Sequence, residues 1–312
     1  MEMETVGMRD RDGQSRPASD GPAGPPGAAG LSHPSHLSGG RELAPGIVVL
    51  STAVALISLG VGGLLLVASL TGRAAGPWVS PEALSPGLLG AAMAGTAPAL
   101  LTVGRAGTWE EARTLVWPLA VVLTGLFAVS LLNAGQLRIA TGGPLFLALF
   151  SLGWVATLAL LAVAAVVCLT LQYRRPPGVR PAPVAPLPGW SKPLLAVLGA
   201  GWFGVGTGLL VAPEFWGALV PWQVSRADAQ GLGVWAVALG VGVLGSLAED
   251  DLARIRPALL AVPVVAVAFG VLLAVRASAV DWGSGAALCL VGLVAGLLVT
   301  GVSGRLLWSR RG

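Results

Sequence analysis

The chain has 312 residues, of which 54% are hydrophobic and only 11% are charged, whereas roughly 25% of the residues in an average soluble domain are charged. This composition excludes an ordinary soluble domain and predicts a polytopic membrane protein. The net charge of +4 does not indicate nucleic-acid binding, because the basic residues lie between apolar stretches rather than together on one folded domain.

Residues 1–45 form a predicted disordered cytoplasmic tail. They are rich in Gly, Pro and Ser, show no apolar periodicity, and cannot bury enough surface to offset the entropy lost on ordering. His33 and His36 are the only histidines of the chain, and such a pair in a polar tail is weak evidence for a metal site. Cys168 and Cys289 both fall within apolar stretches. We therefore predict no disulfide framework, no metal and no cofactor.

Eight stretches after the tail are apolar and long enough to cross about 30 Å of hydrocarbon at 1.5 Å per residue. The second and the sixth are short and rich in Ala and Gly, which suits helices packed among neighbours rather than against lipid. No charged residue interrupts any stretch, which argues against a proton-coupled pump. The predicted fold is all-α, with about eight transmembrane helices. They span residues 46–70, 86–104, 115–133, 145–171, 193–212, 231–247, 258–275 and 284–304.

A proline-rich segment, YRRPPGVRPAPVAPLPGWSK at residues 173–192, separates the fourth stretch from the fifth. Proline fixes φ and removes a backbone donor, so this segment is predicted to be an exposed linker rather than a helix. It divides the chain into a first four-helix unit at 46–172 and a second at 193–307. A short tail at 308–312 ends the sequence.

The basic residues predict the orientation. With the N-terminus in the cytoplasm, 15 of the 19 basic residues fall in cytoplasmic segments, which is the positive-inside asymmetry of membrane proteins. The preference for Arg over Lys suggests a GC-rich bacterial genome. We therefore expect a multi-pass protein of a bacterial inner membrane with both termini in the cytoplasm. The four basic residues on the other side are Arg73, Arg138, Arg226 and Arg276.

The two halves repeat. A shift of 144 residues places GVG at 60–62 on GVG at 204–206, LLVA at 65–68 on LLVA at 209–212, and Pro77-Trp78 on Pro221-Trp222. Composition bias alone would hardly produce that run. Because each unit has an even number of helices, both copies must insert in the same orientation. We therefore predict an internal duplication that gives two parallel four-helix repeats.

Residues 221–262 contain a GLGVW segment that leads into a helix, and then an acidic and arginine-rich turn before RPAL. This pattern resembles that of uncharacterised bacterial integral membrane proteins with a four-helix repeat. The resemblance implies the fold and no particular activity. The first copy departs from the pattern because it lacks a tryptophan at the position that matches Trp235.

Aromatic residues form one candidate site. Trp202, Phe203 and Trp235 lie away from the ends of their spans and occur only in the second half. They are candidates for an apolar ligand pocket between the repeats, although packing in the core or against lipid explains the same residues more simply.

Charged residues form a second candidate site, a cytoplasmic docking surface. Acids at one helix end and arginines at the next are also typical of a solvated turn. Asn133, at the outer edge of the third span, is expected to be solvated. The docking candidates are Glu249, Asp250, Asp251, Arg254 and Arg256.

No Ser-His-Asp set and no HExxH motif occurs in the membrane region, which disfavours an enzyme. The sequence favours a non-enzymatic structural or accessory membrane component. Its expected partners are the lipid bilayer and a membrane protein or a second copy of the chain. The alternative is a carrier or binding protein for a small apolar or lipid-like molecule held between the repeats.

Overall fold

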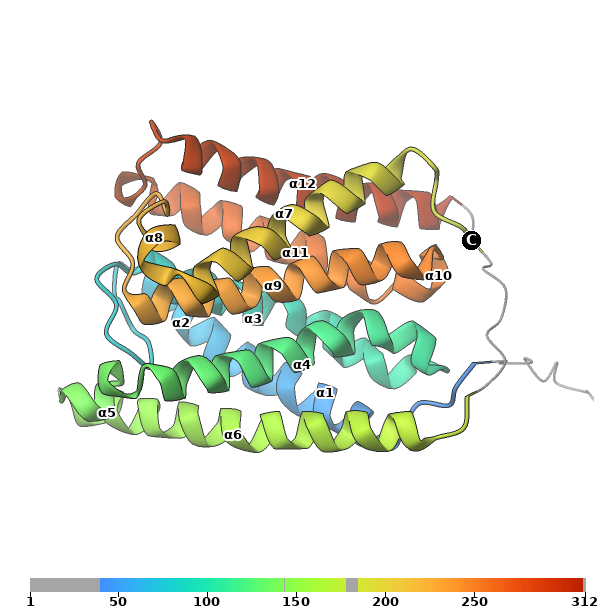
Figure 1. Cartoon of the computed structure of the whole chain (residues 1–312), viewed down its shortest axis with the longest axis horizontal. Coiled ribbons are helices and arrows are strands. Elements are labelled where there is room, and N and C mark those ends of the chain that lie inside the picture. The colour runs from blue at the N-terminus through green and yellow to red at the C-terminus, as the bar shows by residue number, and fades with distance from the viewer. Residues whose placement is uncertain (1–39, 143, 178–184, 311–312) are drawn as a thin grey trace, which may run out of the picture. The chain divides into compact units, whose positions relative to one another are not determined.

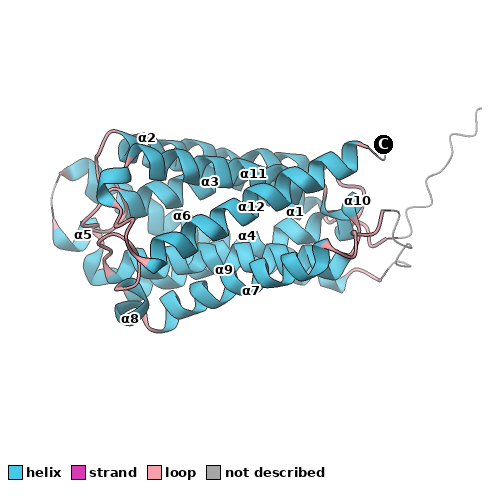
Figure 2. Cartoon of the chain, turned by 90° about the horizontal axis from the view of Figure 1, so that it is seen from above, coloured by secondary structure: helices cyan, strands magenta, loops and turns pink. Residues whose placement is uncertain are grey.

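The computed structural model describes residues 40–142, 144–177 and 185–310. The predicted disordered tail, for residues 1–39, and the linker at 178–184 lie outside these described ranges. The described residues form helices joined by loops (Figure 2), with two isolated β-bridges and no strand among them. The all-α prediction is therefore confirmed.

Eight helices within the described ranges are long and apolar enough to cross a membrane, which confirms the predicted number. The first is interrupted by a π-helical turn at Ser58–Gly62, so it consists of α1 (Pro45–Ile57) and α2 (Gly63–Leu70). The other seven are α3 (Leu84–Thr102), α4 (Trp109–Leu132), α6 (Leu145–Arg174), α7 (Ser191–Val211), α9 (Arg226–Glu249), α11 (Ala258–Val275) and α12 (Gly285–Ser309). Three short α-helices lie between them in the described ranges: α5 (Arg138–Thr141), α8 (Pro213–Gly217) and α10 (Leu252–Ile255).

The long helices run side by side (Figure 1). We call the end at which α6 stops and α7 begins the linker end, and the opposite end, which carries α5 and α8, the far end. The most buried span is α3, with 67% of its apolar window inside the protein, whereas α12 has 22%. The prediction that the Ala- and Gly-rich second span packs among neighbours is thus confirmed.

The two halves pack through their second and third spans. Helix α3 of the first half lies against α11 of the second half, and α4 of the first half lies against α9 of the second. Within each half, the first span packs on the second, as α7 does on α9, and the third packs on the fourth. These four kinds of helix contact therefore recur when the halves are exchanged.

Glycines bring the first and second spans of each half close together. A Cβ on Gly62 would lie 2.9 Å from the carbonyl oxygen of Gly90, and one on Gly206 would lie 2.7 Å from that of Gly233. Only glycine permits such an approach of two helix backbones. Gly62 and Gly206 match under the shift of 144, whereas the glycines that they face, Gly90 and Gly233, are offset from that match by one residue.

Two sequence predictions are wrong at the linker end. Residues 40–44 were expected in a disordered tail, yet Ala44 is buried and its amide donates to Oε1 of Gln172 at 2.7 Å. Ala185 and Leu187 belong to the segment predicted to be exposed, yet both are buried against Leu252. Proline prevents a regular helix but does not prevent the residues between prolines from packing. Proline content therefore did not predict the burial of Ala185 and Leu187.

Candidate functional site

An apolar cavity of about 350 Å³ lies in the second half, between α7 and α12. The two helices touch near the middle of the bundle, where Leu198 faces Gly296 and Leu293 faces Gly201. From there α7 slants away from α12 toward the far end (Figure 1). The space that opens between them is closed on the other sides by α3, α8, α9 and α11. We call it the second-half cavity.

Two of the three predicted aromatic residues line this cavity. Trp202 on α7 and Trp235 on α9 are 5% and 8% exposed and both belong to its wall. Their indole N–H groups are buried and have no hydrogen-bond partner among the described residues. Phe203 does not line the cavity and is 42% exposed. Consecutive helical residues point about 100° apart, so Trp202 and Phe203 cannot share one face.

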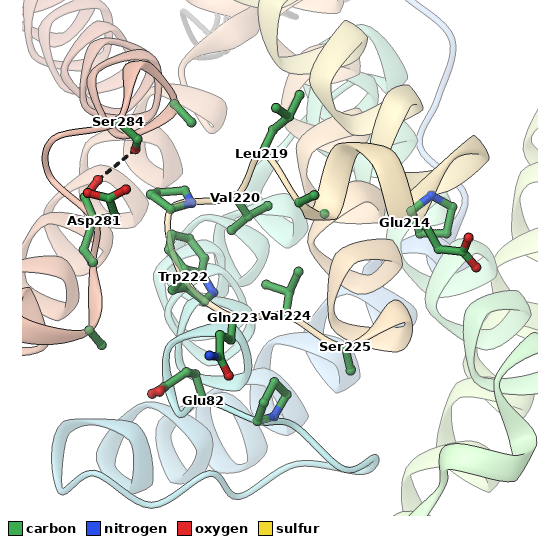
Figure 3. Close-up of a pocket in the computed structure, with 18 of the residues that line it drawn as sticks. Glu82, Glu214, Leu219, Val220, Trp222, Gln223, Val224, Ser225, Asp281 and Ser284 are labelled. Atoms are coloured by element: carbon green, nitrogen blue, oxygen red, sulfur yellow. Dashed lines mark hydrogen bonds between the residues drawn. The ribbon is translucent and has the colours of Figure 1, made fainter.

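A wider, polar space of about 1230 Å³ adjoins the cavity at the far end. We call it the vestibule. Its lining includes charged side chains of both signs, namely Glu82, Glu214, Asp281 and Arg226. Figure 3 shows the three carboxylates on different sides of the segment that runs from Leu219 to Ser225.

The vestibule and the second-half cavity share part of their walls. The shared residues are Leu219, Val220, Pro221, Trp222 and Ala286. Two hydrogen bonds fix this shared wall: Trp222 Nε1 donates to Ser85 Oγ at 2.9 Å, and the Asp281 amide donates to the Pro221 carbonyl at 2.7 Å. The two spaces therefore offer a polar environment and an apolar environment on the two sides of this shared wall. Such an arrangement suits a molecule with a polar end and an apolar body.

A buried carboxylate joins the halves beside this region. Asp228 is fully buried in the first turn of α9, and its Oδ1 accepts from Trp78 Nε1 at 2.8 Å and from Ser80 Oγ at 2.7 Å. Its Oδ2 accepts from the hydroxyl and the amide of Ser225, which completes a capping box. This cluster was not predicted from the sequence, because the sixth span was expected to begin at residue 231, whereas α9 begins at Arg226. The Ser225-x-x-Asp228 spacing is the signal that could have found it.

The prediction that Asn133 is solvated is wrong. Asn133 is 5% exposed, and its Nδ2 donates to Oε1 of Gln230 at 2.7 Å and to the Val129 carbonyl at 2.9 Å. Gln230 in turn donates to the Leu210 carbonyl at 3.2 Å. The amide groups therefore link the end of α4 to the start of α9, where a polar side chain near apolar spans finds a partner within the protein.

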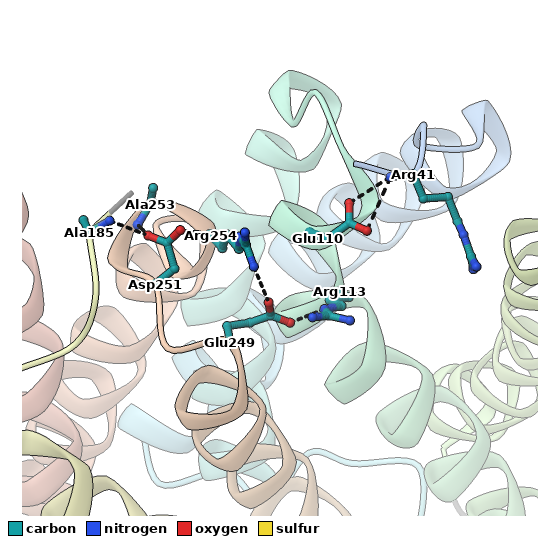
Figure 4. A network of polar contacts seen from close by, with 8 residues as sticks. All are labelled: Arg41, Glu110, Arg113, Ala185, Glu249, Asp251, Ala253 and Arg254. Carbon is teal, nitrogen blue, oxygen red and sulfur yellow. Dashed lines mark hydrogen bonds and ion pairs between the residues drawn. The ribbon is translucent and has the colours of Figure 1, made fainter. Parts of the chain in front are cut away.

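At the linker end, three of the five docking candidates are turned into the protein (Figure 4). Glu249, Asp251 and Arg254 are at most 5% exposed. Glu249 pairs with Arg113 of α4 and lies 3.7 Å from Arg254. Asp251 lies 3.4 Å from Arg254 and accepts from the Ala185 amide at 3.2 Å. This network joins both halves to the linker.

The other two docking candidates keep contact with solvent. The Asp250 side chain is 39% exposed and accepts from Lys192 Nζ at 2.6 Å. The ammonium of Lys192, followed by the Leu187 amide, holds the pKa of that carboxyl below its ordinary value. Arg256 is exposed, and its guanidinium lies 5.9 Å from the ring of Trp308.

Within the described ranges, no three His, Cys, Asp or Glu residues lie close enough together to hold a metal ion. Comparison with protein families, with curated proteins and with solved structures gives no match for this chain. The most distinctive part of the candidate site is the second-half cavity.

Proposed function

We propose that the protein binds a small apolar or lipid-like molecule in the second-half cavity, with any polar end of the molecule in the vestibule. The observation that carries this proposal is the cavity of about 350 Å³ beside a polar space. Ligand sites of proteins commonly measure about 300–1,000 Å³ and are mostly apolar with a few polar groups. Trp202 and Trp235 supply large rigid surfaces for such a ligand.

The test is purification in native-like lipid discs, followed by mass spectrometry of the small molecules that remain bound. We expect one apolar or amphiphilic species to be retained. Trp202→Ala should lower its retention about tenfold, as is common when a buried aromatic contact is truncated. Phe203→Ala is the matched control, because its ring lies outside the cavity wall. Equal retention in the two variants would contradict the proposal.

A second candidate function is that of a structural or accessory component that docks a membrane-protein partner at the linker end. The exposed Arg256 beside Trp308 and the half-exposed Asp250 support it, since Arg and aromatic residues are enriched at interfaces. Arg256→Glu should abolish co-purification of a stoichiometric partner. Unchanged co-purification would count against this surface.

For the orientation, we propose that the linker end faces the cytoplasm of a bacterium, which the distribution of the basic residues supports. Two exposed glycines with open space around them, Gly107 at the linker end and Gly135 at the far end, permit a symmetrical test. Each is replaced by cysteine in a Cys168→Ser, Cys289→Ser background. A membrane-impermeant thiol reagent added outside intact cells should label only the cysteine at position 135. Labelling of position 107 alone would reverse the orientation.

A further inference from the structure

A second apolar cavity, of about 500 Å³, lies in the first half. It is bounded by α1, the π-helical turn, α2, α3, α4 and α6, and we call it the first-half cavity. Like the second-half cavity, it lies between the first and fourth spans of its own half. Val61 lines it and Val205 lines the other cavity, and these residues match under the shift of 144.

The two cavities meet at one side chain. Among the described residues, only Trp235 lines both. It also lines a small space of about 90 Å³ between α3, α4, α9 and α11. The position that matches Trp235 in the first half is Ala91, so this indole has no counterpart there. The Trp235 ring thus borders both the first-half cavity and the second-half cavity, and we call it the partition between them.

We propose that Trp235 sets the length of apolar chain that the second-half cavity accepts. This inference rests on the proposed function and adds the class of ligand: a linear apolar chain whose polar end lies in the vestibule. The chain enters past Val220 and Trp222, which border both spaces, and its end stops at the Trp235 ring. Beyond that ring lies apolar space into which a longer chain would extend if the ring were smaller.

The physical consequence is a break in the dependence of affinity on chain length. Each buried methylene raises affinity about fourfold, equivalent to ~0.8 kcal/mol. In the wild-type protein this gain ends at the length that reaches Trp235. In Trp235→Leu the gain should continue over additional carbons. The variant is expected to fold, because the indole N–H that it removes has no hydrogen-bond partner in the part of the chain that the structure describes, so no such bond is lost.

The probes are straight-chain primary alcohols of increasing length with a photoreactive diazirine at the terminal carbon. They are added to the full chain in lipid discs, and mass spectrometry identifies the residues that become crosslinked. Labelling counts as specific when an unlabelled alcohol of the same length suppresses it. In the wild type we expect labels on Val205 and Leu293. In Trp235→Leu, long probes should also label Leu123 and Leu158, which line the first-half cavity and are 3% and 5% exposed.

Two further variants serve as controls. Trp202 lines the second-half cavity and not the first, so Trp202→Leu enlarges one cavity without joining the two and should give no label on Leu123 or Leu158. Gly153 lines the first-half cavity and has open space around it. Gly153→Leu in the Trp235→Leu background should therefore suppress the new labels.

The outcomes separate the two proposals. Absence of specific labelling at the second-half cavity of the wild type would refute ligand binding there, and with it the role of Trp235. Labelling there, combined with no label on Leu123 or Leu158 in Trp235→Leu, would refute only the role of Trp235. Labels on those two leucines in the wild type, or in Trp202→Leu, would also show that Trp235 is not the limiting partition.

Discussion

A Cβ atom on Gly206 would lie 2.7 Å from the carbonyl oxygen of Gly233, so α7 and α9 touch backbone to backbone at this point. The same Cβ would lie 2.5 Å from the amide nitrogen of Val237. Both neighbours are backbone atoms of one helix and cannot turn aside, so an added methyl must push α7 and α9 apart.

Gly206→Ala should therefore lower the stability of the protein by about 1–3 kcal/mol, the usual cost of overpacking. The midpoint of unfolding in a titration with sodium dodecyl sulfate measures the change. Gly204→Ala, two residues earlier on the same helix, is the control because nothing lies within 4 Å of its added Cβ. It should be neutral or stabilising by up to about 1 kcal/mol. Equal losses in both variants would contradict close packing at Gly206.

Glu249→Gln should destabilise the protein by about 3 kcal/mol. The substitution leaves Arg113 and Arg254 without the carboxylate that both approach, and breaking a buried ion pair commonly costs about 3–5 kcal/mol. The lower end applies because the Arg113 side chain remains 28% exposed.

Glu42→Gln provides the comparison for that variant in the same unfolding titration. Glu42 and Arg175 are 3.3 Å apart, but the Glu42 side chain is 87% exposed. Exposed pairs contribute less than about 1 kcal/mol. A similar loss in the two variants would show that burial does not govern the strength of these ion pairs.

Trp78→Phe should cost more stability than Trp222→Phe. Both indole rings are buried. Because each variant replaces an indole with a phenyl ring, the two variants lose comparable packing and differ in the hydrogen bond that is removed. Trp78 donates to a carboxylate, whereas Trp222 donates to the Ser85 hydroxyl. Hydrogen bonds to charged groups contribute about 1.5–3 kcal/mol and neutral ones about 0.5–1.5 kcal/mol. Thermal unfolding in lipid discs compares the two, and a larger loss in Trp222→Phe would reverse the assignment.

The contact between Asp250 and Lys192 should be lost in acid. Because the pKa of Asp250 lies below its ordinary value in the folded protein, the stabilisation is complete above the ordinary carboxyl pKa and disappears as pH falls through the lowered one. A spin label on a cysteine at the exposed position 189, in a background without other cysteines, should become more mobile in that range.

Asp250→Asn should abolish this pH dependence of label mobility. Asp251 is the other carboxylate that holds the same segment, through the Ala185 amide at 3.2 Å. If Asp250→Asn kept the wild-type pH profile, Asp250 would not be the group that controls the mobility of this segment.

The sequence predicted the eight spans because crossing a membrane requires about 20 apolar residues in a row, and that signal is local. It also placed Trp202 and Trp235 among the candidates, although helix geometry should have separated Phe203 from Trp202. The burial of Glu249, Asp251 and Arg254 was not predictable, because a charged turn has the same sequence whether it faces solvent or another helix. The pairing of Trp78 with Asp228 joins residues 150 positions apart, and no local pattern specifies such a contact.

That separation has a consequence for the order in which the protein is made. Ribosomes add roughly 5–20 residues per second, so Trp78 emerges roughly 8–30 s before Asp228, whose carboxylate accepts the hydrogen bond from the Trp78 indole. During that interval the Trp78 indole lacks the carboxylate of the second half that accepts its hydrogen bond. Ser85 likewise precedes its donor, Trp222, by 137 residues. The first four helices are therefore made before either of these hydrogen bonds can form, and both bonds become possible only as the sixth span emerges.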